Sequence, residues 1–171
     1  MQLMSRAMLS SSAILVLTIL HHFYGAVIYS TPWRAHVAFF AGPVLVALAV
    51  AWLINRSWAT LALGTIAKWT FVVLAGLVSF GMFGMYEGGY NHFLKDILYF
   101  GGTPSETLRA MFPAPAYEMP NDFLFEVSGV AQFFVGLWAG YDLYRVIRPW
   151  RDLSSSATTG SAHLGNTAQS V

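Results

Sequence analysis

Long apolar segments separated by short polar ones dominate this chain. The first covers about residues 8–29 and contains the run SAILVLTIL, and the others cover about residues 37–54, 66–86 and 121–147. A bilayer core about 30 Å thick needs about 20 predominantly apolar residues in an α-helix. The pattern therefore predicts an all-α integral membrane protein built as a four-helix bundle.

Polar and aromatic residues mark the ends of these segments. Asn55 and Arg56 close the second segment. Lys68 and Trp69 fall inside a longer apolar stretch, and we place them at a membrane interface, where lysine extends to water and tryptophan anchors the helix. The first segment could instead be a signal peptide with Arg6 as its basic start. Because no small-x-small cleavage pattern follows it, we expect an uncleaved membrane anchor.

The segment between the third and fourth spans has a structure of its own. Residues 91–100 carry apolar side chains at helical spacing and end at two glycines, and a second helix start follows at Thr103 with Pro104 and Glu106. We therefore expect residues 88–120 to form a two-helix extracytoplasmic cap. Gly88 and Gly89 would allow a sharp turn into this cap.

Composition supports the membrane assignment and excludes several functions. Hydrophobic residues make up 56% of the chain and charged residues only 10%, with a mean hydropathy of +0.55, whereas soluble domains carry about a quarter charged residues. The net charge of +1 gives no basic excess, so we expect no nucleic-acid partner. The absence of cysteine excludes disulfides, thiolate metal sites and thioether-linked haem.

The distribution of basic residues predicts the topology. With four spans both termini share a side, and that side carries more Lys and Arg than the other. The basic residues on the side of the termini are Arg6, Arg56, Lys68, Arg145, Arg148 and Arg151. Those on the opposite side are Arg34, Lys95 and Arg109. The positive-inside rule then favours cytoplasmic termini, as in a bacterial-type inner membrane. Residues 1–152 form a single transmembrane domain in this interpretation, and the Ser/Thr/Gly-rich residues 153–171 form a disordered cytoplasmic tail.

Ionisable side chains from three spans fall at one depth near the predicted outer side. Our first candidates for a metal site are His22, Glu87, His92 and Glu126, with His21 next, because adjacent helical residues point about 100° apart and either histidine could face the bundle. Imidazole and carboxylate ligands suit zinc, iron, copper or manganese. Haem is the weaker alternative, since no two histidines clearly face each other deep in opposed spans.

Each candidate also has a purely structural explanation. A histidine in a span could bond a neighbouring helix, Glu126 could be stabilised by a helix N-terminus, and Glu87 with His92 could form an interfacial cap. The chain contains no HExxH motif, no ExxH pair and no nucleophile motif. Whether the protein is an enzyme therefore stays open.

Three functions fit these residues. The first is transition-metal binding for metal handling, transport or redox chemistry. The second is a metal-free accessory or assembly subunit, in which the cap docks a membrane protein partner or a second copy of the chain. The third is a proton-coupled small-solute carrier, which is less favoured because the inner half of the bundle offers few ionisable residues beyond Lys68 and Asp142.

Overall fold

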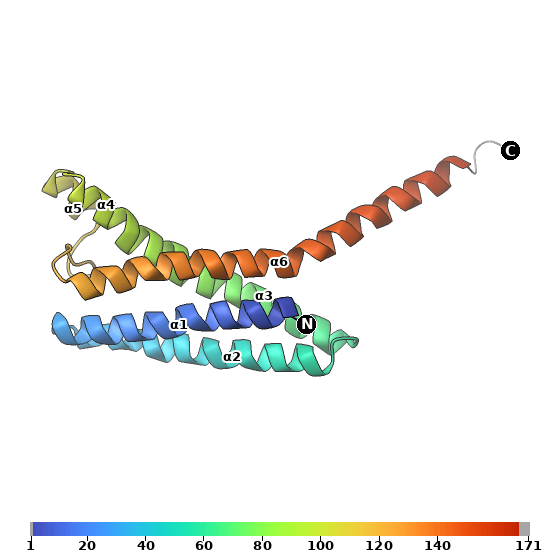
Figure 1. The fold of residues 1–171 in the computed structure, drawn as a ribbon, viewed down its shortest axis with the longest axis horizontal. Helices are drawn as coiled ribbons and strands as arrows, with labels where there is room; N and C mark the ends of the chain where they lie inside the picture. Colours follow the sequence, from blue (N-terminus) through green and yellow to red (C-terminus); the bar gives the residue numbers. More distant parts are fainter. Residues whose placement is uncertain (1, 168–171) are drawn as a thin grey trace.

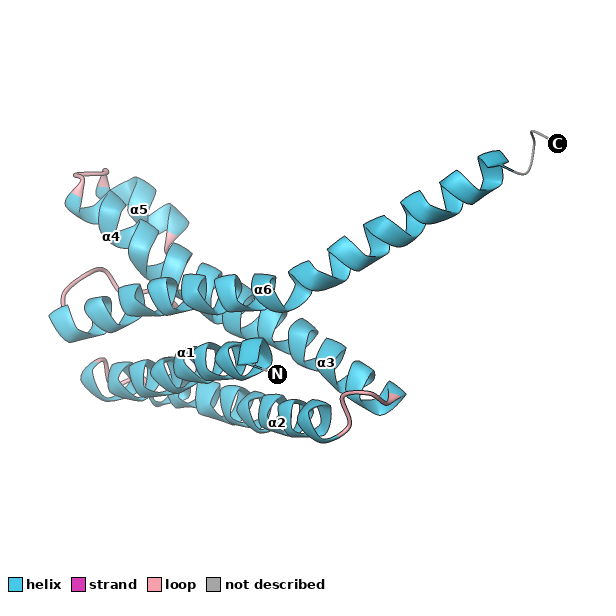
Figure 2. Cartoon of the chain, turned by 45° about the vertical axis from the view of Figure 1, so that its right-hand side comes forward, coloured by secondary structure: helices cyan, strands magenta, loops and turns pink. Residues whose placement is uncertain are grey.

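The computed structural model describes the backbone of residues 2–167 and the side chains of residues 2–148. Every element in these residues is helical (Figure 2). The elements are α1 (Gln2–Ile28), the short 3₁₀ helix η1 (Pro32–His36), α2 (Val37–Ser57), α3 (Ala62–Leu74), the π-helix η2 (Ala75–Leu94), α4 (Lys95–Phe100), α5 (Ser105–Met111) and α6 (Phe123–Thr167). The prediction of an all-α chain is confirmed.

Four helical segments are long and apolar enough to cross a membrane. They are Gln2–Ile28, Pro32–Ser57, Ala62–Phe100 and Phe123–Arg148. In Figure 1, α1 and α2 lie side by side, and α6 lies along α1 and crosses η2, with which it makes its most extensive contact. The four membrane-capable helices are thus confirmed, whereas the membrane boundaries, the outer position of residues 88–120 and the cytoplasmic termini stay predictions.

The third membrane-capable segment is one continuous helix with a π-helical middle. Residues Ala75, Ser79, Gly84, Gly88 and His92 are buried along one face of η2. Their spacing of four or five residues follows the wider turn of a π-helix, whose hydrogen bonds join residue i to i+5. At 20 residues, η2 is much longer than the single π-turns common in helical proteins.

The expectation of a sharp turn at Gly88 and Gly89 is wrong. Both glycines lie within η2, where a Cβ atom on Gly88 would come 2.3 Å from the backbone nitrogen of Phe133. Gly84 meets Gly136 in the same way, with a Cβ on Gly84 only 2.8 Å from the Gly136 Cα. These glycines therefore bring η2 and α6 into close contact, as small residues commonly do between membrane helices.

The long helix ends at Gly101 and Gly102, the two glycines that were expected to end the helix of residues 91–100. α4 stops at Phe100, and Gly102 has a φ of +81° that favours glycine. A short second helix, α5, then follows as predicted, but it begins at Ser105 after Pro104, and no side chain caps its start. The two expected helices between spans are therefore present, but the first of them continues the third span directly instead of folding back from it.

The C-terminal segment also differs from expectation. The composition of residues 153–171 predicts disorder, whereas the backbone of residues 153–167 continues α6, and residues 168–171 lie outside the described part. Extending an existing helix adds a hydrogen bond for each residue without the cost of a new nucleus. Helical continuation is therefore compatible with a polar segment that has no apolar face of its own.

Candidate metal centre

The five predicted site residues gather at one end of the bundle, where α1 ends and α6 begins. α1 contributes His21 and His22, η2 contributes Glu87 and His92, and α6 contributes Glu126. His21, His92 and Glu126 are buried, and His22 and Glu87 are partly buried. Residues more than 100 positions apart in sequence thus meet in one polar cluster inside an apolar bundle.

Three of the five residues are close enough to hold one ion. His21, Glu87 and His92 each offer a ligand atom, and these atoms lie within 4.8 Å of one another. The rings of His21 and His92 meet edge to face, with centroids 4.7 Å apart. Two imidazoles and a carboxylate are a common donor set for transition metals in proteins.

His92 is held at its Nδ1 atom by α6. This nitrogen lies 2.8 Å from Oε2 of Glu126, so a proton on Nδ1 is donated to the carboxylate. The lone pair is then left on Nε2, which lies 3.8 Å from Oε1 of Glu87. Gly129 makes room for the ring, because a Cβ atom there would come 2.2 Å from His92.

His21 is held in the same way by a different residue of α6. Its Nδ1 atom lies 2.9 Å from the hydroxyl of Ser128, and that hydroxyl donates its own proton to the carbonyl oxygen of Phe125 at 3.0 Å. The serine oxygen therefore accepts from Nδ1–H, which places the imidazole lone pair on Nε2. That Nε2 atom is buried and has no hydrogen-bond partner among the described residues.

Glu87 links these imidazoles to the second histidine of the pair. Its Oε2 atom accepts a hydrogen bond from Nδ2 of Asn91 at 2.7 Å, and its Oε1 atom lies 3.3 Å from Nε2 of His22. The Nδ1 atom of His22 is buried without a partner among the described residues. One carboxylate oxygen is thus oriented by an amide, and the other faces the imidazoles.

A buried lysine completes the cluster, and sequence reasoning missed it. Lys95 is only 1% exposed, and its Nζ atom lies 3.1 Å from Oε1 of Glu126 and 2.8 Å from the carbonyl oxygen of Glu118. Arg34 is buried nearby and bonds the Glu118 carboxylate at 3.1 Å. The sequence analysis places both cations on the predicted outer side but gives neither a part in the site. The helical spacing of Lys95, three residues after His92, was the available signal for its place in the site.

A cavity of about 220 Å³ borders the cluster. Its lining includes His22, Glu87, His92 and Lys95, together with Tyr117 from the segment between α5 and α6. Burial and a 2.7 Å hydrogen bond with Tyr86 raise the pKa of the Tyr117 phenol, so this side chain stays uncharged. The cavity therefore provides space for a small molecule beside the ionisable residues.

The structure separates the roles of the five predicted residues. Sequence reasoning ranked His22 above His21, but the group with the closest ligand atoms contains His21. His22 bonds Glu87, and Glu126 bonds both His92 and Lys95. Asn91 holds the Glu87 carboxylate, and the Tyr90 hydroxyl donates to the carbonyl oxygen of Met111.

Comparisons with family models, with curated proteins and with solved structures find no match to this chain. The case for its function therefore depends on the geometry of the cluster.

Proposed function

We propose that this is an integral membrane protein that binds a transition-metal ion through His21, Glu87 and His92, for metal handling, transport or redox chemistry. One observation carries the proposal. Each buried imidazole is held at Nδ1 by an oxygen of α6, which leaves both Nε2 lone pairs free to bind a metal, and both histidines have a ligand atom close to the Glu87 carboxylate. Metal-binding histidines in proteins are commonly held by such a bond at their other nitrogen.

The surrounding charges fit a bound cation. Glu126 accepts the Nδ1 proton of His92, which raises the basicity of that imidazole as a ligand. Lys95 offsets the Glu126 charge, so the Glu87 carboxylate supplies the negative charge that faces the ion. His22, whose Nε2 atom lies 3.3 Å from Oε1 of Glu87, helps to hold the carboxylate in place.

The ligand set leaves room for an external group. Three protein ligands are typical of sites that keep a further position open, in contrast to closed structural sites with four. The neighbouring cavity of about 220 Å³ borders Glu87 and His92 and would give access to that position. A metal bound there would supply Lewis acidity or redox chemistry, or would itself be the cargo.

The test is elemental analysis of the purified protein by mass spectrometry. The wild type should carry close to one zinc, iron, copper or manganese ion per chain, and H21A and E87Q should lose it. H36A is the matched control, because His36 lines the same cavity but is not one of the three closely spaced ligands. Thermal unfolding of each variant shows whether it is folded. A folded wild type without metal after growth and purification with added metal would refute the proposal.

A metal-free accessory or assembly subunit is the second candidate. It is favoured by the buried ion pair of Lys95 with Glu126, since such a network can be complete without an ion. A membrane partner or second copy would then co-purify stoichiometrically with the metal-free protein. Metal content and co-purification together therefore distinguish the two functions.

A further inference from the structure

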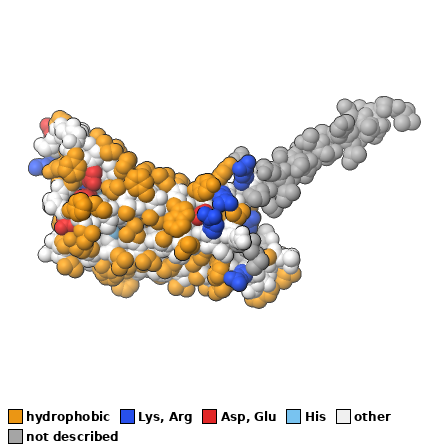
Figure 3. All heavy atoms as spheres, viewed as in Figure 1, with side chains coloured by type: hydrophobic (Ala, Val, Ile, Leu, Met, Phe, Trp, Pro, Cys, Tyr) orange, Lys and Arg blue, Asp and Glu red, His pale blue; other side chains and the backbone are white. Residues whose placement is uncertain are grey.

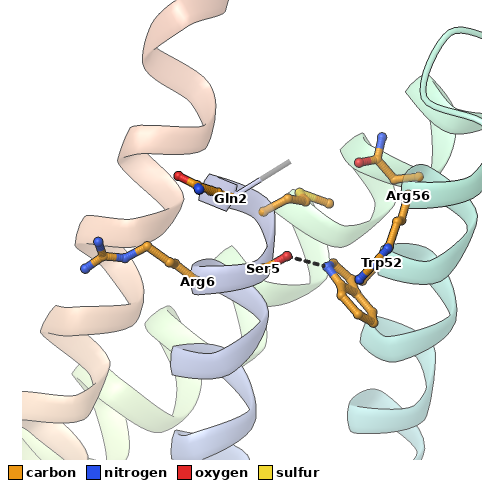
Figure 4. A pocket seen from close by; sticks show the side chains of 7 residues that line it. Gln2, Ser5, Arg6, Trp52 and Arg56 are labelled. Carbon is orange, nitrogen blue, oxygen red and sulfur yellow. Dashed lines mark hydrogen bonds between the residues drawn. The ribbon is translucent and has the colours of Figure 1, made fainter.

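A second pocket lies at the opposite end of the bundle, between the start of α1 and the end of α2. Its volume is about 430 Å³, within the range typical of ligand sites. Figure 4 shows Ser5 and Trp52 facing each other across it, with the indole nitrogen donating to the Ser5 hydroxyl at 3.3 Å. The pocket shares no lining residue with the metal centre.

The charge of this pocket is positive. Arg6 and Arg56 belong to its lining, and no Asp or Glu among the described side chains does. The Arg56 guanidinium carbon lies 5.5 Å from the centre of the Trp52 ring, and no carboxylate among the described side chains is within ion-pair distance of Arg56. Arg6 points toward α6, where its Nε atom is 3.7 Å from Asp142, but its side chain is still 59% exposed. The pocket therefore favours an anion.

The pocket lies where an apolar bundle surface meets the polar end of two membrane-capable helices. Leu9, one turn beyond Ser5, is 61% exposed, and Leu53, next to Trp52, is 51% exposed. Figure 3 shows Lys and Arg side chains gathered at this end of the molecule, and most of the visible Asp and Glu side chains at the other. A ligand here can place an anionic group on Arg56 and hydrocarbon chains on the exposed leucines.

We propose that this pocket binds the phosphate headgroup of an anionic phospholipid, with the acyl chains along α1 and α2. Basic pockets between membrane helices on the cytoplasmic side bind such headgroups, and the positive-inside rule predicts that this end faces the cytoplasm. Trp52 is then an interfacial aromatic residue that holds Arg56 toward the phosphate. The inference does not depend on the metal centre, and its failure would leave metal content unchanged.

The experiment is a titration of detergent-solubilised full-length protein with short-chain phosphatidylglycerol, followed by thermal unfolding. A ligand that binds the folded state raises the unfolding temperature with its concentration. We expect saturable stabilisation by phosphatidylglycerol and little by phosphatidylcholine. R56Q should weaken the apparent affinity by about fivefold or more, since one basic residue contributes about 1 kcal/mol, and R56K should retain most of it.

K68Q is the matched control, because Lys68 is a cation of α3 that does not line the pocket. Equal loss of affinity in K68Q and R56Q would show general surface attraction and overturn the proposal. Equal stabilisation by phosphatidylcholine, or an unchanged affinity in folded R56Q, would also overturn it.

A titration with glycerol 3-phosphate distinguishes binding of a lipid from binding of a soluble phosphate. If it binds as tightly as phosphatidylglycerol, the pocket takes a soluble phosphate and the lipid assignment is wrong.

Discussion

Glu87 and His92 lie five residues apart on η2, and yet His92 Nε2 comes 3.8 Å from Glu87 Oε1. In an α-helix, residues five apart point about 140° away from each other, since each residue turns the chain by about 100°. In a π-helix the i→i+5 relationship replaces i→i+4, so these two side chains share a face. The local helix type therefore brings Glu87 and His92 together in the candidate metal site.

The first prediction concerns the space for His92. G129A should reduce the metal content of the purified protein and destabilise it by about 1–3 kcal/mol, because overpacking forces the neighbouring side chain to move. The new Cβ would meet the His92 ring at 2.2 Å. G42A is the control, because a Cβ on Gly42 has no neighbour within 4 Å. Metal content and unfolding in a denaturing detergent series measure both effects, and full metal content in G129A would contradict the site geometry.

The second prediction concerns the buried ion pair. E126Q should destabilise the protein by about 3–5 kcal/mol, because it leaves Lys95 as an uncompensated buried cation. Adding K95M should restore most of that loss, since the double variant buries neither charge. Unfolding free energies for the two single variants and the double variant test this. Additive losses would mean that Lys95 and Glu126 do not interact as described.

The third prediction separates ligand orientation from folding. S128A removes the oxygen that accepts from Nδ1 of His21, 2.9 Å away. Metal affinity should fall by about 10–100-fold, as for other residues that orient metal ligands. Stability should change by no more than about 1.5 kcal/mol, the scale of one hydrogen bond. Competition with a fluorescent chelator measures the affinity, and an unchanged value would show that Ser128 does not orient the ligand.

The fourth prediction uses a polar contact away from the site. The Thr18 hydroxyl donates to Oε1 of Gln132 at 2.6 Å in the buried interface of α1 and α6. T18V should cost about 0.6–1.7 kcal/mol, as measured for hydrogen bonds between membrane helices. Its metal content should equal that of the wild type. Loss of metal in a folded T18V variant would indicate that the centre depends on the packing of α1 as a whole.

Hydropathy alone determined the helical class and the number of membrane-capable helices. The free energy of transferring a segment into a bilayer is a sum over its residues, so it can be estimated without knowing the fold. The residue types of the site were also readable, since ionisable side chains in apolar spans stand out. His21, His22, Glu87, His92 and Glu126 were all identified in this way and do meet in one cluster.

Only the tertiary structure decided how these residues are arranged. The close contacts of Gly88 and Gly129 with the opposing helix set the register of η2 against α6, and that register brings Lys95 onto Glu126 and Ser128 onto His21. The hydropathy of a segment depends only on its residue types, so it does not indicate how one helix slides or rotates against another. The pairing of atoms, by contrast, changes completely with a shift of one residue, so the choice between His21 and His22 depended on close packing between helices.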